Sequence, residues 1–315
     1  MDDTHQLSPR SLALMHVASC AFMQPLDMVK VRLQTQGAVK SYGGIWSCMR
    51  QVAAEQGTRA LWRGAVPSLG VMVVSSQVSA VLASKPAQAG AQDLTIFLSP
   101  QYQSEALAAA IGSAVVRAKG SIVSQSLAIA YDISLSLLRR QVTTPLQVIK
   151  CRMQYDRPSL GAAHRTTLQC VQTILQESGP RGLFRGVLGR AMAHSVGAVG
   201  AALPLAATAL AMPQYVGSDR QPVPAETLAV LSVATFGTGF GLMLPLDMLV
   251  TRLHAMPPPA GRAFQTLRAE TRMVVSQHGL RGLFAGGMAS LLAGGAAFTG
   301  GMLAFSIGAL LEHGA

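Results

Sequence analysis

The sequence predicts an all-α membrane protein of six transmembrane helices, built as three copies of one unit. Two unlike strings recur in the same order along the chain. The first string is PLDMVKVRLQ from Pro25, PLQVIKCRMQ from Pro145 and PLDMLVTRLH from Pro245. The second is EQGTRALWRG at 55–64, ESGPRGLFRG at 177–186 and QHGLRGLFAG at 277–286. Matched recurrence of both strings indicates an internal repeat, which decides the fold before any other pattern.

The composition indicates that each copy crosses a membrane twice. Charged residues make up 12% of the chain, whereas a soluble domain carries about 25%. Segments without Asp, Glu, Lys or Arg reach 20 residues or more at 64–84, 191–218, 227–246 and 282–311. About 20 apolar residues span a bilayer core. Weaker segments, interrupted by Arg10 and Asp132, precede the first two prolines, which brings the total to six helices.

The spacing of the copies sets the domain boundaries. Pro25 and Pro145 lie 120 residues apart, but Pro145 and Pro245 lie only 100 apart. The extra residues fall between the second and third helices, where they form a solvent loop or a docking element. We therefore predict repeat 1 at 1–84, an inserted loop at 85–121, repeat 2 at 122–218 and repeat 3 at 219–315.

Basic residues gather between each repeated proline and the glycine that ends the second string. These segments (26–64, 146–186 and 246–286) hold 17 of the 25 basic residues but 6 of the 14 acidic ones. By the positive-inside rule they face the compartment of synthesis or its equivalent, and they also suit anionic lipid. The N-terminal sequence resembles neither a secretory signal nor a transit peptide.

No pattern in the chain indicates catalysis. The cysteines have no metal-ligand spacing, and we find no phosphate-binding loop and no nucleophile arrangement. We therefore expect no enzyme activity, no metal and no nucleic-acid partner.

The first string predicts a gate built from charged side chains. Proline inside a transmembrane helix kinks it, so Pro25, Pro145 and Pro245 predict three kinks at one membrane face. Asp27 and Lys30 follow the first proline by two and five residues. A carboxylate of one repeat can then meet an ammonium of the next. Such ion pairs can hold a gate shut until a ligand supplies other contacts.

On these motifs, the chain resembles the mitochondrial carrier family, as a divergent member. That family repeats Px[DE]xx[KR]x[KR] and then [DE]Gx4[WYF][KR]G, and the resemblance covers nearly the whole chain. It implies a multi-pass transporter of the mitochondrial inner membrane, with a short matrix helix in each repeat. It also implies that the string closes the matrix side, and that loop 85–121 faces the intermembrane space.

In the family, the acid of one repeat pairs with the base of the next. The resemblance therefore implies pairs of Asp27 with Lys150 and of Asp247 with Lys30, braced by Gln34 and Gln154. The third pair would join Gln147 and Val250, which carry no charge. Losing both partners avoids a stranded charge, which would cost about 3–5 kcal/mol. We expect a matrix gate that is weaker by one pair.

The cavity above the gate carries the substrate in the family. The candidate binding residues at this level are Arg140, Arg190, His194, His16 and Asp132, because an ionisable residue in a membrane span indicates a functional site. Two arginines and one acid suit a carboxylate or an amino-acid-like solute. Alternatively, Asp132 and Arg140 pair with each other or extend towards the ends of the span.

The second string is a lipid site in the family. The resemblance implies cardiolipin bound at Arg63, Gly64, Arg185, Gly186 and Gly286, where free backbone N–H groups suit phosphate. No other bound cofactor is expected.

Two functions remain open at this stage. The first is transport of a small solute by alternating access. The second is a structural subunit, derived from a carrier but no longer transporting, that sits with other protein subunits in a respiratory complex of the inner membrane. The second is motivated by the family's outer charged signature, whose positions hold Ser84, Ala206 and Ser306.

Overall fold

The structure is a computed structural model, and every regular element it describes is a helix. It describes residues 9–36, 41–83, 141–155, 166–211, 225–257 and 266–313. The predicted loop 85–121 and the candidate residues Asp132 and Arg140 lie outside these ranges.

The three copies have the same order of elements, as the repeated strings predict. Each has a helix that carries the first string, a 12-residue helix, a 3-10 turn and a long helix. In the first copy these are α1 (Pro9–Gln34), α2 (Ile45–Gln56), η1 (Thr58–Trp62) and α3 (Ala65–Ala83). In the second they are α7 (Thr144–Tyr155), α8 (Thr167–Ser178), η3 (Pro180–Phe184) and α9 (Val187–Ala211). In the third they are α10 (Ala225–Ala255), α11 (Leu267–His278), η5 (Leu280–Phe284) and α12 (Gly287–His313).

Two glycines in each copy set the path of the chain between the short and the long helix. Gly57, Gly179 and Gly279 end the short helices at φ of 82°, 65° and 67°. Gly64, Gly186 and Gly286 follow the 3-10 turns at φ of 81°, 78° and 74°. Residues with a Cβ rarely adopt positive φ. The glycines of the second string are therefore required by the backbone.

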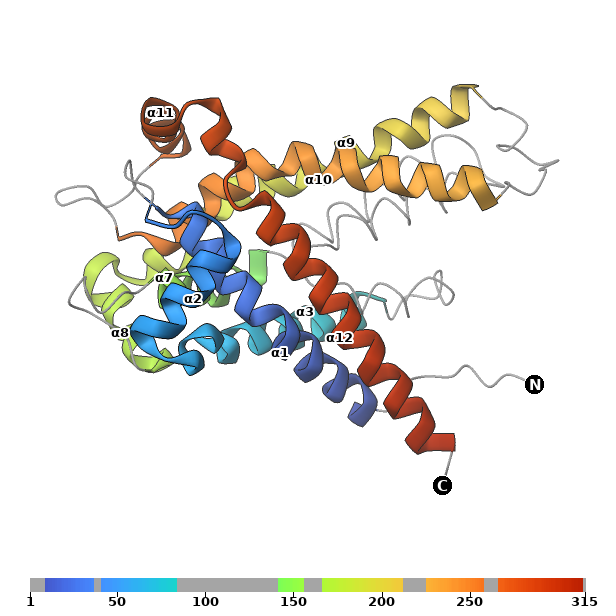
Figure 1. The fold of residues 1–315 in the computed structure, drawn as a ribbon, viewed down its shortest axis with the longest axis horizontal. Helices are drawn as coiled ribbons and strands as arrows, with labels where there is room; N and C mark the ends of the chain where they lie inside the picture. The colour runs from blue at the N-terminus through green and yellow to red at the C-terminus, as the bar shows by residue number, and fades with distance from the viewer. Residues whose placement is uncertain are drawn as a thin grey trace.

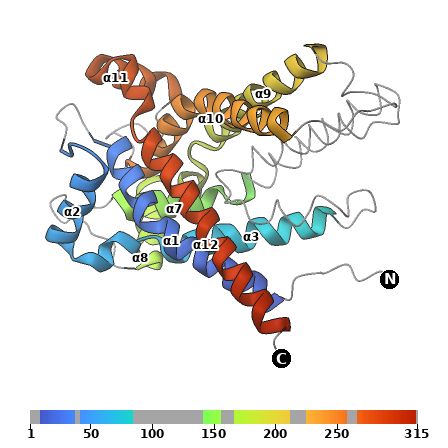
Figure 2. The ribbon, with the colours of Figure 1, turned by 45° about the vertical axis from the view of Figure 1, so that its right-hand side comes forward.

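The short helices gather at one end of the molecule, and the long helices extend from them (Figures 1 and 2). Helix α1 runs beside α12, and α9 runs beside α10, so each pair joins two different repeats. The two pairs diverge towards the end where α1 begins and α12 ends.

Glycine lets the paired helices approach closely. A Cβ on Gly239 of α10 would lie 2.9 Å from the carbonyl oxygen of Gly197 in α9. Thr238 Oγ1 also donates to the carbonyl of Gly200 over 2.8 Å. A Cβ on Gly300 of α12 would lie 3.0 Å from the Ala18 carbonyl oxygen in α1. Close helix contact at small residues is the usual packing mode in membranes.

Three stretches within the described ranges are long and apolar enough to cross a membrane: Pro180–Thr208, Val230–Ala255 and Leu280–Gly301. The prolines behave differently in the three copies. Helices α1 and α10 continue through Pro25 and Pro245, whereas α7 begins next to Pro145, after a non-helical Thr143. A kink at Pro25 and at Pro245 stays a prediction.

Candidate functional site

A buried ion pair joins repeat 1 to repeat 2. Lys150 Nζ lies 2.8 Å from Asp27 Oδ2, and the two side chains are 3% and 1% exposed. Gln154, one helical turn beyond Lys150, donates from Nε2 to the same oxygen over 2.8 Å. This is the pairing and the brace that the resemblance implies. The second donor reduces the cost of burying the carboxylate, because it satisfies a further lone pair.

An equivalent pair joins repeat 3 to repeat 1. Lys30 Nζ lies 2.8 Å from Asp247 Oδ2, and the Asp247 side chain keeps 21% of its surface exposed. Gln34 does not brace this pair: its amide atoms are buried and have no hydrogen-bond partner among the described residues. Instead its side chain lies against Gly286, where a Cβ would come within 2.8 Å of Gln34 Cγ.

The boundary between repeats 2 and 3 is held without an ion pair of this kind. Gln147 and Val250 occupy the two positions of the missing pair, and both are buried. Val250 packs on Gly189 of α9, where a Cβ would lie 3.0 Å from Val250 Cγ2. His254 packs on Gly186, where a Cβ would lie 2.9 Å from His254 Nε2. Among the described residues, apolar and small-residue contacts thus occupy the place of the missing ion pair at this boundary.

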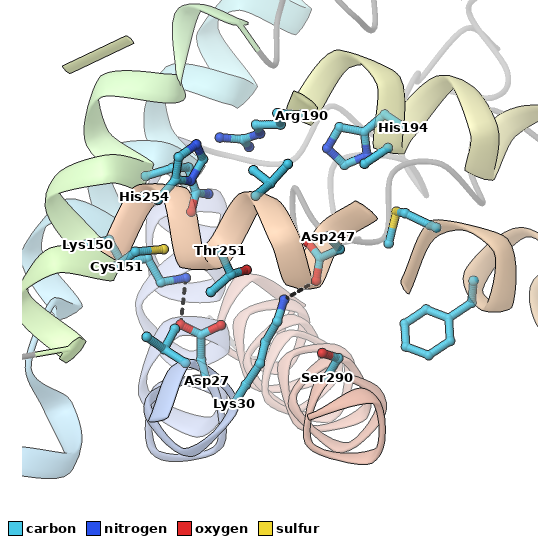
Figure 3. A pocket seen from close by; sticks show the side chains of 16 residues that line it. Asp27, Lys30, Lys150, Cys151, Arg190, His194, Asp247, Thr251, His254 and Ser290 are labelled. Carbon is cyan, nitrogen blue, oxygen red and sulfur yellow. Dashed lines mark ion pairs between the residues drawn. The ribbon is translucent and has the colours of Figure 1, made fainter. Parts of the chain in front are cut away.

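The ion pairs line one pocket with about 680 Å³ of empty space, part of which opens to solvent. Figure 3 shows Asp27 and Lys30 on α1, Lys150 on α7 and Asp247 on α10. Across the pocket, α9 contributes Arg190 and His194. The pocket is completed by Val31, Gln147, Cys151, Ala193, Phe240, Met243, Val250, Thr251, His254 and Ser290.

Arg190 is a buried cation of the pocket whose guanidinium has no ion-pair partner in the described part of the chain. Arg190 is only 6% exposed. Its Nη1 atom is buried and has no hydrogen-bond partner among the described residues. A guanidinium stays charged in proteins. An uncompensated charge of this kind is costly to bury, so Arg190 is the strongest candidate for contact with an anion.

The structure brings together only part of the predicted substrate set. Arg190 and His194 line the pocket, but His16, which is half-buried on α1, does not. Sequence reasoning missed Cys151, Thr251 and Ser290, which supply polar or sulfur atoms to the lining. Cys151 lies one residue after Lys150, and Ser290 lies on α12. Neither position belongs to a sequence motif that could have indicated it. No group of His, Cys, Asp and Glu among the described residues could hold a metal ion.

The sequence analysis also named no partner for the arginine seven residues after each proline. All three of these arginines donate to a backbone carbonyl near the end of the long helix in the next repeat. Arg32 Nε reaches Gln154 O over 2.7 Å, and Arg252 Nη1 reaches Gln34 O over 3.2 Å. Arg152 Nη1 reaches Ala255 O over 3.5 Å. The signal was their recurrence in every copy, including those copies that lack an acid or a lysine.

Two of these arginines also bind an acid of their own short helix. Arg152 Nη2 contacts both carboxylate oxygens of Glu177, at 2.6 and 2.8 Å. Arg252 Nε lies 3.3 Å from Glu270 Oε1, and both of these side chains are almost fully buried. Arg152 and Arg252 thus each connect the end of a first-string helix to two neighbouring elements.

The predicted lipid residues other than Arg63 take part in contacts between repeats. Arg185 is buried and donates from Nη1 to the Met256 carbonyl over 2.8 Å, while Arg63 donates to the Gln56 side chain. Gly64 packs against Gln154 and the Lys150 carbonyl, so that a Cβ would lie within 3.4 Å of both. Lipid binding by these residues stays a prediction.

A scan of family models matches the chain to the family described as "Mitochondrial carrier protein", over residues 13–85 and 136–203. These ranges contain the first string of repeats 1 and 2. The repeat at Pro245 lies beyond them and is assigned by its likeness to the first two.

Curated relatives have similar names. The chain is 25% identical to the mitochondrial carnitine/acylcarnitine carrier protein of Macaca fascicularis, over 83% of this chain and 79% of that protein. It is 30% identical to the human protein of that name, over 52% of this chain and 48% of the relative. It is also 30% identical to mitochondrial thiamine pyrophosphate carrier 1 of Eremothecium gossypii, over 51% of this chain and 42% of the relative.

These relatives are named as carriers of solutes and not as enzymes, and the fold, the three repeats and the ion pairs between them agree with the family match. The comparisons and the structure thus support membership of the mitochondrial carrier family, as a divergent member at about 25% identity.

Proposed function

We propose that the protein moves a small solute across the mitochondrial inner membrane by alternating access. The observation that carries this proposal is the pair of buried ion pairs, Asp27–Lys150 and Lys30–Asp247, on one side of a pocket that reaches solvent. Both pairs join different repeats. Opening a path on that side requires the repeats to separate, and separation breaks these contacts.

The solute supplies the free energy that opens the gate. A ligand shifts a two-state equilibrium only through its different affinity for the two states. A solute in the pocket can contact Arg190, His194 and the gate side chains together, and so offset the loss of their ion pairs. One boundary has no pair to break, so this gate opens at a lower cost than a gate with three pairs.

The pocket suits a carboxylate or an amino-acid-like solute. Arg190 can bind a carboxylate through two parallel N–H groups, and His194 lies one helical turn further along α9. The relatives differ in the solutes that their names give, carnitine and acylcarnitine against thiamine pyrophosphate. The solute class is therefore argued from the pocket and not from the relatives.

The membrane setting follows from the same proposal. A multi-pass orientation with the basic segments on the matrix side satisfies the positive-inside rule. Cardiolipin bound at the ends of the short helices would suit the basic excess there. Neither the alternative of a non-transporting subunit nor a protein partner gains support from the relatives, which are named as carriers.

Reconstitution of the full chain in liposomes tests the proposal. Labelled carboxylates and amino acids are loaded inside, and exchange with the same solute outside is followed. The variant Lys150→Gln, which removes one gate pair, should lower the exchange rate or allow leakage. The variant Arg181→Gln, an exposed arginine of the same repeat, should behave as the unchanged chain does.

Failure has a clear signature. Folded protein that exchanges no solute from a broad panel contradicts transport. Co-purification with other inner-membrane proteins at fixed stoichiometry would then favour the structural-subunit alternative.

A further inference from the structure

We propose that the solute binds as a single anion at the boundary between repeats 2 and 3, where Arg190 supplies its counter-charge in place of the missing gate pair. This inference rests on the proposed transport function for the identity of the ligand as a solute. It goes further in naming the charge of the ligand and the boundary that holds it.

The charges in the pocket leave one cation over. Among the described residues, its lining holds five formally charged side chains: Asp27, Asp247, Lys30, Lys150 and Arg190. Each aspartate lies 2.8 Å from a lysine. The two acids and the two lysines therefore cancel, and Arg190 leaves the described part of the lining with a net charge of +1.

The other buried arginines show that an unpartnered Arg190 is unusual in this molecule. Arg152 and Arg252 each contact a carboxylate and a carbonyl oxygen. Arg32 and Arg185 each donate to a backbone carbonyl, over 2.7 and 2.8 Å. Native proteins rarely leave a buried charge uncompensated, and such a group calls for an explanation. A bound anion provides one, because it satisfies the guanidinium only when the site is occupied.

The position of Arg190 identifies the boundary. It follows Gly189, on which Val250 packs. A Cβ added to Gly189 would lie 3.0 Å from Val250 Cγ2. Figure 3 places its guanidinium on the same side of the pocket as His254 of α10. Nε2 of His254 is also buried without a partner in the described residues. Unsatisfied polar atoms from repeats 2 and 3 thus meet where Gln147 and Val250 carry no charge.

The charge balance selects among ligand classes. An amino-acid-like zwitterion would need a carboxylate for its ammonium group, but Asp27 and Asp247 are already paired. A second anionic group would meet Lys30 or Lys150, which are already paired with Asp247 and Asp27. A monoanion, whether a carboxylate or a phosphate group, neutralises the excess charge of Arg190 without needing the charge of any gate residue.

The bound anion would then act as a removable link between two repeats. In the other two boundaries, the opposite charges belong to the protein and are always present. At this boundary the negative charge arrives and leaves with the ligand. The free-energy difference between the closed and open states therefore depends on occupancy through this contact, together with the contacts that the solute makes to the gate side chains.

Thermal stability of the purified full chain tests the inference. The probes are propionate, succinate, β-alanine, propylammonium and inorganic phosphate at matched ionic strength. They represent a monoanion, a dianion, a zwitterion, a cation and a second source of anionic oxygen. We expect propionate or phosphate to raise the apparent melting temperature most, and the comparison of these two identifies the anionic group.

Variants at Arg190 separate binding from folding. Arg190→Gln removes an unpaired buried charge, so it should raise the melting temperature of the empty protein. The same change should weaken the anion response at least about tenfold, because charge-assisted hydrogen bonds are lost. Arg190→Lys keeps the charge without the planar fork and should fall between the two. Arg181→Gln is the matched control and should respond as the unchanged chain does.

The outcomes divide cleanly. An undiminished anion response in Arg190→Gln, a larger response to β-alanine or succinate, or no response to either monoanion overturns the inference. If Arg190-dependent anion binding is present but liposomes show no exchange, transport is contradicted and the anion site stands. If exchange continues in Arg190→Gln with the same charge preference, transport stands and the anion site is contradicted.

Discussion

Gln154 and Lys150 of repeat 2 both contact the same carboxylate oxygen, Asp27 Oδ2 of repeat 1, at 2.8 Å each. One acid is thus held by two donors from one turn of α7. The acid and both donors are almost fully buried. This contact should be the strongest of the predicted gate, since the equivalent Asp247 is more exposed and has no glutamine brace.

Asp27→Asn should destabilise the protein more than Asp247→Asn. The first change strands the Lys150 ammonium in a buried site, at a cost of about 3–5 kcal/mol. The second also strands an ammonium, that of Lys30, which is 4% exposed, but solvent reaches the Asp247 position beside it, so the loss should be smaller. The apparent melting temperatures of the two variants in detergent measure the difference.

The matched control is the double variant Asp27→Asn with Lys150→Gln. It removes both charges and should recover a large part of the loss, because no buried charge is left unpaired. Equal melting temperatures for the two single variants would contradict the ranking of the two pairs.

Rebuilding the third pair should couple Gln147 to Val250. Val250→Lys alone adds a cation to a pocket that already holds the unpaired Arg190, so it should be strongly destabilising. Gln147→Asp alone should be tolerated better, because the new carboxylate can approach Arg190. The double variant should be more stable than the sum of the single effects predicts, by roughly 0.5–3 kcal/mol, the range for residues in contact.

A double-mutant cycle of melting temperatures measures this coupling, and liposome exchange measures its consequence. A restored third pair adds a contact that must break, so we expect slower exchange. Additive effects of the two substitutions would show that these side chains do not face each other across the boundary.

The sequence predicted the architecture of the gate because the relevant signal repeats. The resemblance of the repeated string to the carrier family implied the partners Asp27–Lys150 and Lys30–Asp247, and the structure has these contacts. Comparison of the copies also indicated which boundary lacks a pair. Such inferences need only the order of residues along three equivalent helices.

Other features depend on packing that no local pattern records. Gln154 and Gln34 occupy equivalent positions in the repeat. Gln154 donates a hydrogen bond to Asp27, whereas the amide of Gln34 has no partner among the described residues. Likewise, Arg190 was a candidate by its place in an apolar span. Its lack of a partner emerged only from the positions of the surrounding side chains.

Alanine at Gly186 should cost more than alanine at Gly179, although both glycines have positive φ. Either substitution costs about 1–2 kcal/mol for the left-handed backbone. At Gly179 a Cβ would meet nothing within 4 Å. At Gly186 it would lie 2.9 Å from His254 Nε2, so the imidazole must move in a packed boundary.

The apparent unfolding free energies of the two variants provide the comparison. Adding His254→Ala should restore part of the loss in Gly186→Ala and none of the loss in Gly179→Ala. If the two alanine variants were equally stable, Gly186 would not be required for contact between repeats 2 and 3.

The effect of glycine-to-alanine substitutions in α10 on the stability of the protein should change sign within about one helical turn. Gly239 faces α9, and a Cβ there would lie 2.9 Å from both the Gly197 carbonyl oxygen and Ala201 Cβ. At Gly237 and Gly241 a Cβ would meet nothing within 4 Å. Replacing glycine by alanine in open space stabilises a helix by about 0.5–1 kcal/mol. At Gly239 the gain is outweighed, because α9 and α10 must separate to make room.

We therefore expect Gly239→Ala to lower the apparent melting temperature, and Gly237→Ala and Gly241→Ala to leave it unchanged or raise it. The three variants change the same atoms on the same helix, so a general effect of alanine would move all three together. A uniform response would contradict close α9–α10 contact. A loss confined to Gly239 would show that backbone proximity holds repeats 2 and 3 together at the boundary that has no ion pair.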